Sequence, residues 1–128
     1  MLSPGLYRLT LGIIFAVFAA FCCSELAAAA PATGVVQVSQ LPLEARVTYR
    51  LVRSGGPFPY PKDGMVFGNR ERELPAKARG YYREYTVQTP GARDRGARRL
   101  VCGGYESVKP EACYYSDDHY SSFRKIVE

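Results

Sequence analysis

The chain of 128 residues contains no tryptophan, a single histidine and only four cysteines. Two of the cysteines, Cys22 and Cys23, lie in an N-terminal segment that we expect to be removed. Proteins hold zinc and similar metals with clusters of cysteine, histidine and carboxylate ligands. Cys102 and Cys113 with the distant His119 do not make such a cluster, so the sequence predicts no metal and no cofactor.

The sequence also lacks an apolar run long enough to span a membrane. Residues 12–23 are uncharged and apolar, whereas a transmembrane helix needs about 20 such residues. The cation Arg8 precedes this run and small residues follow it, which is the order typical of a secretory signal peptide. We expect residues 1–32 to be a leader cleaved after Ala32, and residues 33–128 to be secreted without stable membrane association.

Other arrangements of this leader stay open. The apolar run could be a retained membrane anchor, or a lipid could anchor Cys22 or Cys23, although Phe21 is a poor residue before a lipidated cysteine. Cleavage after Ala30 would leave Pro31 next to the cut, which is unfavourable.

No repeat, low-complexity tract or internal linker interrupts residues 33–128, so we expect one small domain. Two cysteines in an exported domain commonly pair, which predicts a Cys102–Cys113 disulfide. The segment between them contains Gly and Pro and is typical of a loop that joins two strands. Such a bridge would stabilise the domain by roughly 3 kcal/mol.

One helix is predicted at residues 41–53. Its apolar positions Leu43, Val47 and Leu51 follow a near-helical period, and the Gly-Gly-Pro sequence at residues 55–57 ends it. The preceding residues 33–39 are expected to form a loose arm.

After the helix the chain is rich in aromatic and β-branched residues, which favour strands. Glycine, proline and asparagine separate the candidates, which are residues 65–67, 81–86, 100–102, 114–116 and 123–127. The sequence therefore predicts an α+β fold, with one main N-terminal helix packed on an antiparallel β-sheet.

Positive charge exceeds negative charge, with 17 lysines and arginines against 12 acidic residues. Arginines cluster between Arg70 and Arg99, which suggests a polyanionic partner such as nucleic acid or an anionic surface. A solvated basic face without any partner would explain the charge equally well.

Four of these arginines, Arg93, Arg95, Arg98 and Arg99, lie between one carboxylate, Glu84, and the only imidazole, His119. A carboxylate that accepts a proton, an imidazolium that donates one and arginines that hold phosphate can break a phosphodiester without a metal. Arginine suits phosphate because its planar fork binds two oxygens at once. Each residue alone is ordinarily a surface residue, so only the combination favours this chemistry.

The order of short motifs resembles the secreted microbial ribonucleases of the barnase-like family, and most closely its shorter members. The similarity extends from about Gln40 to Ile126 and includes Gly56-Pro57-Phe58-Pro59-Tyr60, Asn69-Arg70-Glu71, Glu84-Tyr85-Thr86-Val87 and Asp118-His119-Tyr120. The resemblance implies the microbial ribonuclease fold. It also implies metal-independent endonucleolytic cleavage of RNA 3′ of guanosine through a 2′,3′-cyclic phosphate.

The resemblance assigns a role to each catalytic candidate. Glu84 matches the general base and His119 the general acid. Arg95 and Arg99 match the phosphate-binding arginines, with Tyr120 beside the phosphate.

Phe67, Gly68, Asn69, Arg70 and Glu71 match the guanine-binding loop. Glu71 would accept hydrogen bonds from the base, backbone N–H groups would donate to its carbonyl oxygen, and Asn69 would shape the loop. Shorter relatives usually carry a larger polar residue in place of Gly68, so this chain lacks one side chain there.

The expected partner is an RNA substrate, since DNA lacks the 2′-hydroxyl that attacks the phosphorus. The resemblance also suggests a small acidic barstar-like inhibitor, and we expect a monomer. A secreted cytotoxin with the same activity and a non-catalytic RNA- or anion-binding module are the alternatives. Binding alone would need only the cations, so the additional presence of Glu84 and His119 argues against the second alternative.

Overall fold

The computed structural model describes residues 34–128, and the expected leader at residues 1–32 lies outside them. Along the chain come β1 (Val35–Gln37), the 3₁₀ helix η1 (Val38–Gln40), α1 (Leu43–Ser54), β2 (Met65–Val66), β3 (Tyr82–Thr86), β4 (Arg99–Gly103), β5 (Ala112–Ser116) and β6 (Arg124–Val127). Among these described elements, no helix is long and apolar enough to cross a membrane.

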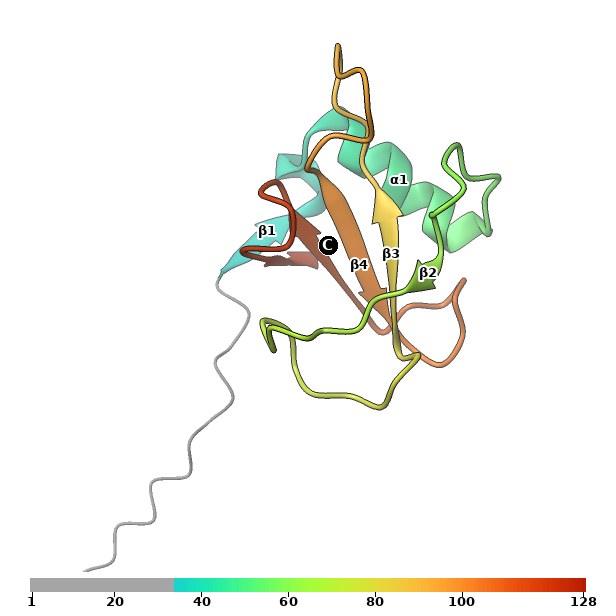
Figure 1. Cartoon of the computed structure of the whole chain (residues 1–128), viewed down its shortest axis with the longest axis vertical. Coiled ribbons are helices and arrows are strands. Elements are labelled where there is room, and N and C mark those ends of the chain that lie inside the picture. The colour runs from blue at the N-terminus through green and yellow to red at the C-terminus, as the bar shows by residue number, and fades with distance from the viewer. Residues whose placement is uncertain (1–33) are drawn as a thin grey trace, which may run out of the picture.

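The strands form one six-stranded sheet in the order β1-β6-β5-β4-β3-β2 (Figure 1). The four pairings among β2–β6 are antiparallel, and β1 pairs with β6 in parallel. The predicted α+β class is confirmed, although the sheet is mixed.

The prediction of a loose N-terminal arm is wrong for residues 35–39. Val36 is buried and lies in register with Ile126 of β6. Pairing with β1 satisfies backbone groups that the edge of β6 would otherwise leave unpaired.

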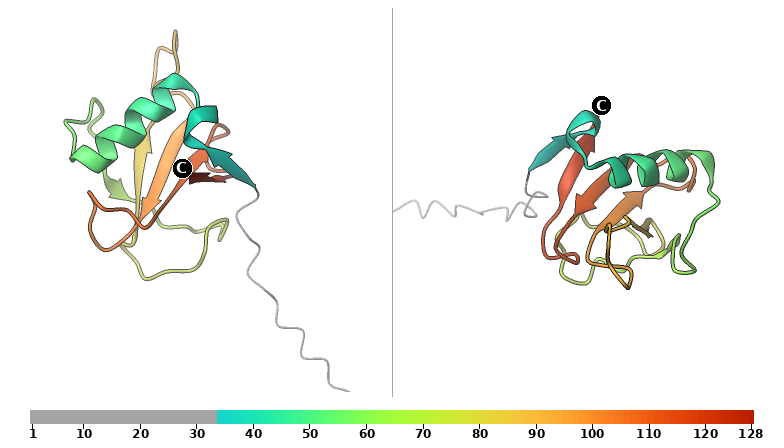
Figure 2. Two further views of the ribbon diagram at one scale, coloured as in Figure 1. Left: turned by 180° about the vertical axis from the view of Figure 1, so that it is seen from behind. Right: turned by 90° about the horizontal axis from the view of Figure 1, so that it is seen from above.

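Helix α1 lies across one face of the sheet, as the view from above shows (Figure 2). The helix ends where Gly55 takes a left-handed conformation with φ of 83°, which glycine adopts without steric cost. The N–H of Gly56 then donates to the carbonyl of Leu51 at 3.0 Å. The predicted stop signal is therefore confirmed.

The buried face of α1 is not the predicted apolar stripe. Ala45, Thr48, Tyr49 and Val52 are the buried positions, whereas Leu43 is 60% exposed. Both sets have helical spacing, so the period identifies the helix but not the face that packs.

Strand alternation divides the sheet's side chains into two layers. Tyr85, Leu100 and Tyr115 pack with the buried residues of α1. On the opposite face, Tyr82 and Val101 belong to a second cluster with Phe123. Glu84 is two residues after Tyr82 on β3, so it lies on this open face, away from the helix.

Cys102 and Cys113 are direct cross-strand partners on β4 and β5 and form a disulfide, which confirms the predicted pairing. Both cysteines belong to the helix-facing layer. The bridge therefore closes the β4–β5 loop from the side of the sheet opposite Glu84.

Replacing both cysteines with alanine is expected to lower the free energy of unfolding by at most about 3 kcal/mol, because the bridge closes a short loop. Urea denaturation measures this loss. The value of kcat/KM should stay near that of the unmodified protein under conditions in which both proteins are folded. Loss of activity in the folded double variant would contradict a purely stabilising role.

Candidate active site

Glu84 lies on the open face of β3, with its side chain 15% exposed. Its Oε1 lies 3.2 Å from Nη2 of Arg95, and its Oε2 accepts a hydrogen bond from the hydroxyl of Tyr120. Arg95 is itself held because its Nε donates to Oγ1 of Thr86 at 3.0 Å. Both carboxylate oxygens are thus oriented by donors from two different loops.

Arg99 begins β4 and is buried, with 3% of its surface exposed. Its Nη1 donates to the carbonyls of Arg98 and Gly96 at 2.7 and 2.9 Å, and its Nε donates to the hydroxyl of Tyr120 at 3.1 Å. These acceptors are neutral, so they fix the guanidinium without cancelling its charge. A buried, preorganised cation of this kind suits a bound anion.

Tyr120 connects the carboxylate to the buried arginine. Its hydroxyl donates to Glu84 and accepts from Arg99. Burial, with a smaller contribution from the hydrogen bond to Glu84, raises the pKa of Tyr120 to about 12. The phenol is therefore a neutral donor throughout the range in which proteins are handled.

The β5–β6 loop holds His119 and Tyr120 in left-handed conformations, with φ of 54° and 70°. Such backbone costs on the order of 1–3 kcal/mol per residue and concentrates at functional sites. Two hydrogen bonds support it: the His119 N–H donates to the carbonyl of Ala97 at 3.0 Å, and the Tyr120 N–H donates to Oγ of Ser116 at 3.0 Å. The imidazole itself is exposed.

Asp118 also stabilises the β5–β6 loop. Its carboxylate accepts hydrogen bonds from the hydroxyls of Ser122 and Ser116, and the bond from Ser122 is the main reason that the pKa of Asp118 is lowered. The sequence motif Asp118-His119-Tyr120 predicted a role for His119, whereas the positioning roles of Ser116 and Asp118 were not predicted.

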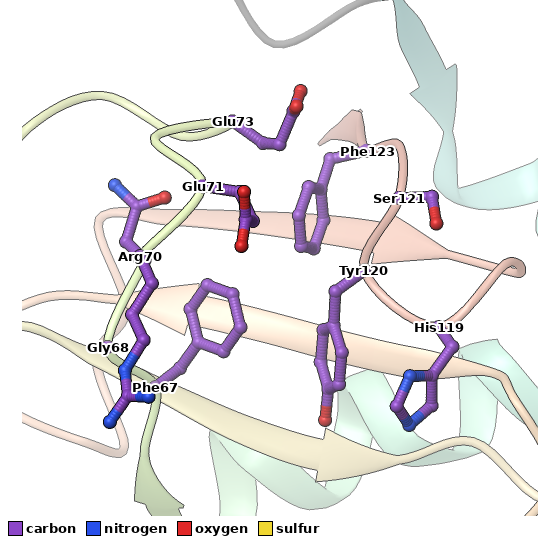
Figure 3. A pocket seen from close by; sticks show the side chains of 10 residues that line it. Phe67, Gly68, Arg70, Glu71, Glu73, His119, Tyr120, Ser121 and Phe123 are labelled. Atoms are coloured by element: carbon purple, nitrogen blue, oxygen red, sulfur yellow. The ribbon is translucent and has the colours of Figure 1, made fainter.

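A cavity of about 330 Å³ opens beside this loop (Figure 3). Its flat walls include the rings of Phe67 and Tyr120, which stack with centroids 5.1 Å apart. Glu71 enters from the β2–β3 loop, and His119 lies on the far side of Tyr120. The full lining is Phe67, Gly68, Asn69, Arg70, Glu71, Glu73, His119, Tyr120, Ser121 and Phe123.

Asn69 gives the β2–β3 loop its shape. Its side-chain amide donates to the carbonyl of Leu74 at 2.9 Å and accepts from the N–H of Leu74 at 3.1 Å. Asn69 also has a positive φ of 48°, a conformation that asparagine tolerates better than most residues. The closed loop presents Glu71 to the cavity.

All five residues predicted for the guanine-binding loop line the cavity, together with His119 and Tyr120. Glu84, Arg95 and Arg99 adjoin it through Tyr120. Glu73 also lines the cavity and was missed, because no motif distinguished it from a solvated loop residue. In residues 34–128, no group of three or more His, Cys, Asp or Glu side chains is placed to hold a metal ion.

The same fold occurs in known proteins. The model of the ribonuclease family matches residues 25–127. Guanyl-specific ribonuclease St of Saccharopolyspora erythraea is 54% identical over 92 residues, which are 72% of this chain and 86% of the relative. Guanyl-specific ribonuclease Sa of Kitasatospora aureofaciens is 52% identical over 94 residues, which are 73% of this chain and 94% of the relative.

Solved structures agree. A structure of ribonuclease Sa2 in complexes with mononucleotides has a TM-score of 0.70 and 48% identity, and the match covers 77% of this chain and 97% of that one. Ribonuclease Sa2 with 3′-GMP has a TM-score of 0.65 and 46% identity, with 73% and 96% covered. The chain belongs to the ribonuclease family, and the resemblance seen in the sequence is confirmed.

Proposed function

We propose that this protein is a guanyl-specific endoribonuclease that cleaves RNA 3′ of guanosine without a metal ion. The placement of Tyr120 supports this most directly. Its ring lines the cavity that contains Glu71 and His119, while its hydroxyl contacts Glu84 and Arg99. A base bound in the cavity therefore has its 3′-phosphate beside a carboxylate, an imidazole and two arginines.

In the first step, Glu84 takes the proton of the guanosine 2′-hydroxyl, and the 2′-oxygen attacks phosphorus. The bond from phosphorus to the 5′-oxygen of the next nucleotide breaks, and His119 gives that oxygen a proton. Arg95 and Arg99 bind the non-bridging oxygens, where charge develops in the transition state. In the second step His119 takes a proton from water, which opens the 2′,3′-cyclic phosphate, and Glu84 returns a proton to the 2′-oxygen.

Base selection follows from the donors and acceptors of guanine. The Watson–Crick edge of guanine offers N–H donors that the Glu71 carboxylate can accept, and backbone N–H groups of residues 67–71 can serve the carbonyl oxygen O6. Adenine has an acceptor where guanine carries its ring N–H, so its lone pair would face the carboxylate. That mismatch costs about 1–3 kcal/mol.

The relatives' names and bound nucleotides support RNA as the substrate. We further propose that the domain is secreted after removal of residues 1–32, that it acts as a monomer, and that a small acidic barstar-like protein inhibits it. N-terminal sequencing of protein from culture medium, size-exclusion chromatography and titration with such an inhibitor test these points separately.

The decisive experiment uses residues 33–128 and a defined oligoribonucleotide in EDTA, with the fragment ends identified by mass. We expect cleavage after guanosine and a transient 2′,3′-cyclic phosphate, while DNA of the same sequence stays intact. Cleavage that requires a divalent metal, or equal cleavage after all four bases, would refute the function. Binding without cleavage would instead indicate the non-catalytic module.

Glu71→Gln is expected to relax base preference more than it slows the chemistry. The amide keeps one acceptor oxygen but turns a donor toward the donors of guanine. The preference for guanosine over adenosine should therefore fall by about 1–3 kcal/mol. The measurement is kcat/KM for a guanosine dinucleotide and an adenosine dinucleotide. The ratio of the two values is compared between the variant and the unmodified enzyme. An equal fall for both substrates would show that Glu71 does not select the base.

A further inference from the structure

Tyr105 is the most exposed large hydrophobic side chain of the described residues, at 85%. It lies in the β4–β5 loop, two residues after β4 ends. Its ring packs against the ring of Tyr81 in an edge-to-face arrangement, with centroids 5.6 Å apart and an angle of 77° between the rings. The ring of Tyr105 thus contacts one protein ring while most of the side chain faces water.

The support beneath Tyr105 is rigid. The hydroxyl of Tyr81 donates to Oε2 of Glu111 at 2.6 Å, and the N–H of Glu111 donates to the carbonyl of Gly103 at 2.7 Å. A Cβ at Gly103 would lie 2.3 Å from the Tyr81 ring, so only glycine allows this close packing. The Cys102–Cys113 disulfide closes the loop behind it. Tyrosine has only two side-chain torsions, so ordering the ring of Tyr105 on this support costs little conformational entropy when a ligand stacks on it.

Tyr105 is connected to the candidate active site through aromatic packing. Tyr81 meets Tyr82 at 4.9 Å, and both belong to the cluster against which Phe67 and Tyr120 of the cavity pack. Positive charge lies nearby, because Nζ of Lys77 is 5.1 Å from the centroid of the Tyr81 ring. The exposed ring of Tyr105 and the cation Lys77 therefore both contact Tyr81, and single-stranded nucleic acid is commonly bound by aromatic rings together with positive charge.

The direction of β3 indicates which base of a bound RNA would lie near Tyr105. Tyr81 directly precedes β3, and the N–H of Phe67 donates to the carbonyl of Tyr82 at its start. Glu84 lies in the middle of β3, and Thr86 is its last residue. Thr86 accepts the hydrogen bond from Arg95. The order along the sheet is therefore Tyr105, base cavity, catalytic groups. RNA that places its scissile phosphate at the catalytic groups sends its 5′ side toward Tyr105.

We infer that Tyr105, supported by Tyr81, forms a stacking subsite for a nucleobase on the 5′ side of the guanosine that is cleaved. This subsite rests on the proposed function, which it extends from a single nucleotide to a longer RNA strand. It accepts any base, because stacking uses the ring face and not the hydrogen-bonding edge.

The kinetic test compares a guanosine dinucleotide with RNA extended by uridines on either the 5′ or the 3′ side of that guanosine. Tyr105→Ala should lower kcat/KM for the 5′-extended RNA by roughly fivefold or more, mainly through KM, and leave the other two substrates unchanged. Tyr105→Phe should keep the wild-type value. Val108→Ala, at an exposed position of the same loop, is the matched control and should change none of them.

The lack of native tryptophan allows a direct binding test, because Tyr105→Trp introduces the only indole. In a His119→Gln background, 5′-extended RNA should quench its fluorescence, whereas 3′-extended RNA should not. If the fluorescence is unchanged and Tyr105→Ala has the same kcat/KM as the unmodified enzyme for all three substrates, the subsite is overturned. Tyr105 would then be assigned to a protein-binding surface instead. Wild-type cleavage of the guanosine dinucleotide would still support the proposed function, so the two can fail independently.

Discussion

Replacing His119 with glutamine is expected to lower kcat/KM for guanosine-containing RNA by about 10²–10⁴-fold, the usual contribution of a positioned proton donor. The leaving 5′-oxygen would depart without a proton from the protein. Because the arginines and the cavity loop stay in place, RNA binding should persist, and the loss should appear in kcat.

The pH profile separates this role from a structural one. Cleavage needs an ionised base and a protonated acid, so kcat/KM of the unmodified enzyme should fall on both sides of an optimum. His119→Gln should remove the alkaline fall and keep the acidic one.

His119→Gln should fold normally, because the His119 side chain is exposed and the backbone N–H at this position can still donate to the carbonyl of Ala97. His119→Asn is the companion variant, since asparagine tolerates the left-handed φ of 54°. Near-normal activity in a folded His119→Gln protein would remove His119 from the mechanism.

The fold was predictable wherever local sequence determines structure. Glycine at residue 55 ends the helix in a left-handed conformation, and aromatic and β-branched runs lie at the central strands. Strand β1 was missed because its three residues bury only Val36 and pair with a segment at the other end of the chain. Nothing local distinguishes such a strand from an arm.

The packed face of α1 shows a second limit. Leu43 and Val47 are more apolar than Thr48 and Tyr49, yet the latter two are buried. Thr48 donates its hydroxyl to the carbonyl of Thr86, and Tyr49 reaches Glu128, so polar partners across the fold offset the burial of their polar atoms. Glu44 and Arg53 of the same helix also bond to these hydroxyls, but only the tertiary structure supplies the partners Thr86 and Glu128.

The members of the candidate site were predicted through family resemblance, but the connections between them were not. No spacing in the sequence indicates that one phenol joins Glu84 to Arg99, or that the amide of Asn69 closes its loop onto Leu74. These contacts join segments whose proximity depends on the whole sheet. They explain why the site is preorganised before any RNA is bound.

Replacing Glu84 with glutamine is expected to cost about as much as the His119 change, roughly 10²–10⁴-fold, because no group would then take the 2′-hydroxyl proton. The acidic fall of the pH profile should disappear while the alkaline fall stays. Glu44→Gln makes the same substitution on the helix, and its kcat should stay within about twofold of the unmodified protein because it removes no group proposed to act in proton transfer.

The hydrogen bonds around Glu84 predict how the loss divides between kcat and KM. Glutamine can accept from Arg95 through its oxygen and donate to the Tyr120 hydroxyl through its nitrogen, so the local packing can persist. Arg95 keeps its 3.0 Å bond to Thr86, and Arg99 keeps its backbone carbonyls. Removing a negative charge beside two arginines should leave RNA binding equal or tighter, so kcat falls while KM does not rise.

Glu84→Asp sharpens the test because it keeps the carboxylate but withdraws it by one methylene. If Glu84 is the base, aspartate should recover part of kcat and restore the acidic fall of the pH profile. If Glu84 only orients Arg95, the shorter aspartate should instead raise KM by withdrawing its carboxylate from Arg95, and both variants should leave the pH profile unchanged. That second pattern would contradict the proton-transfer role, even if the protein still cleaved RNA after guanosine.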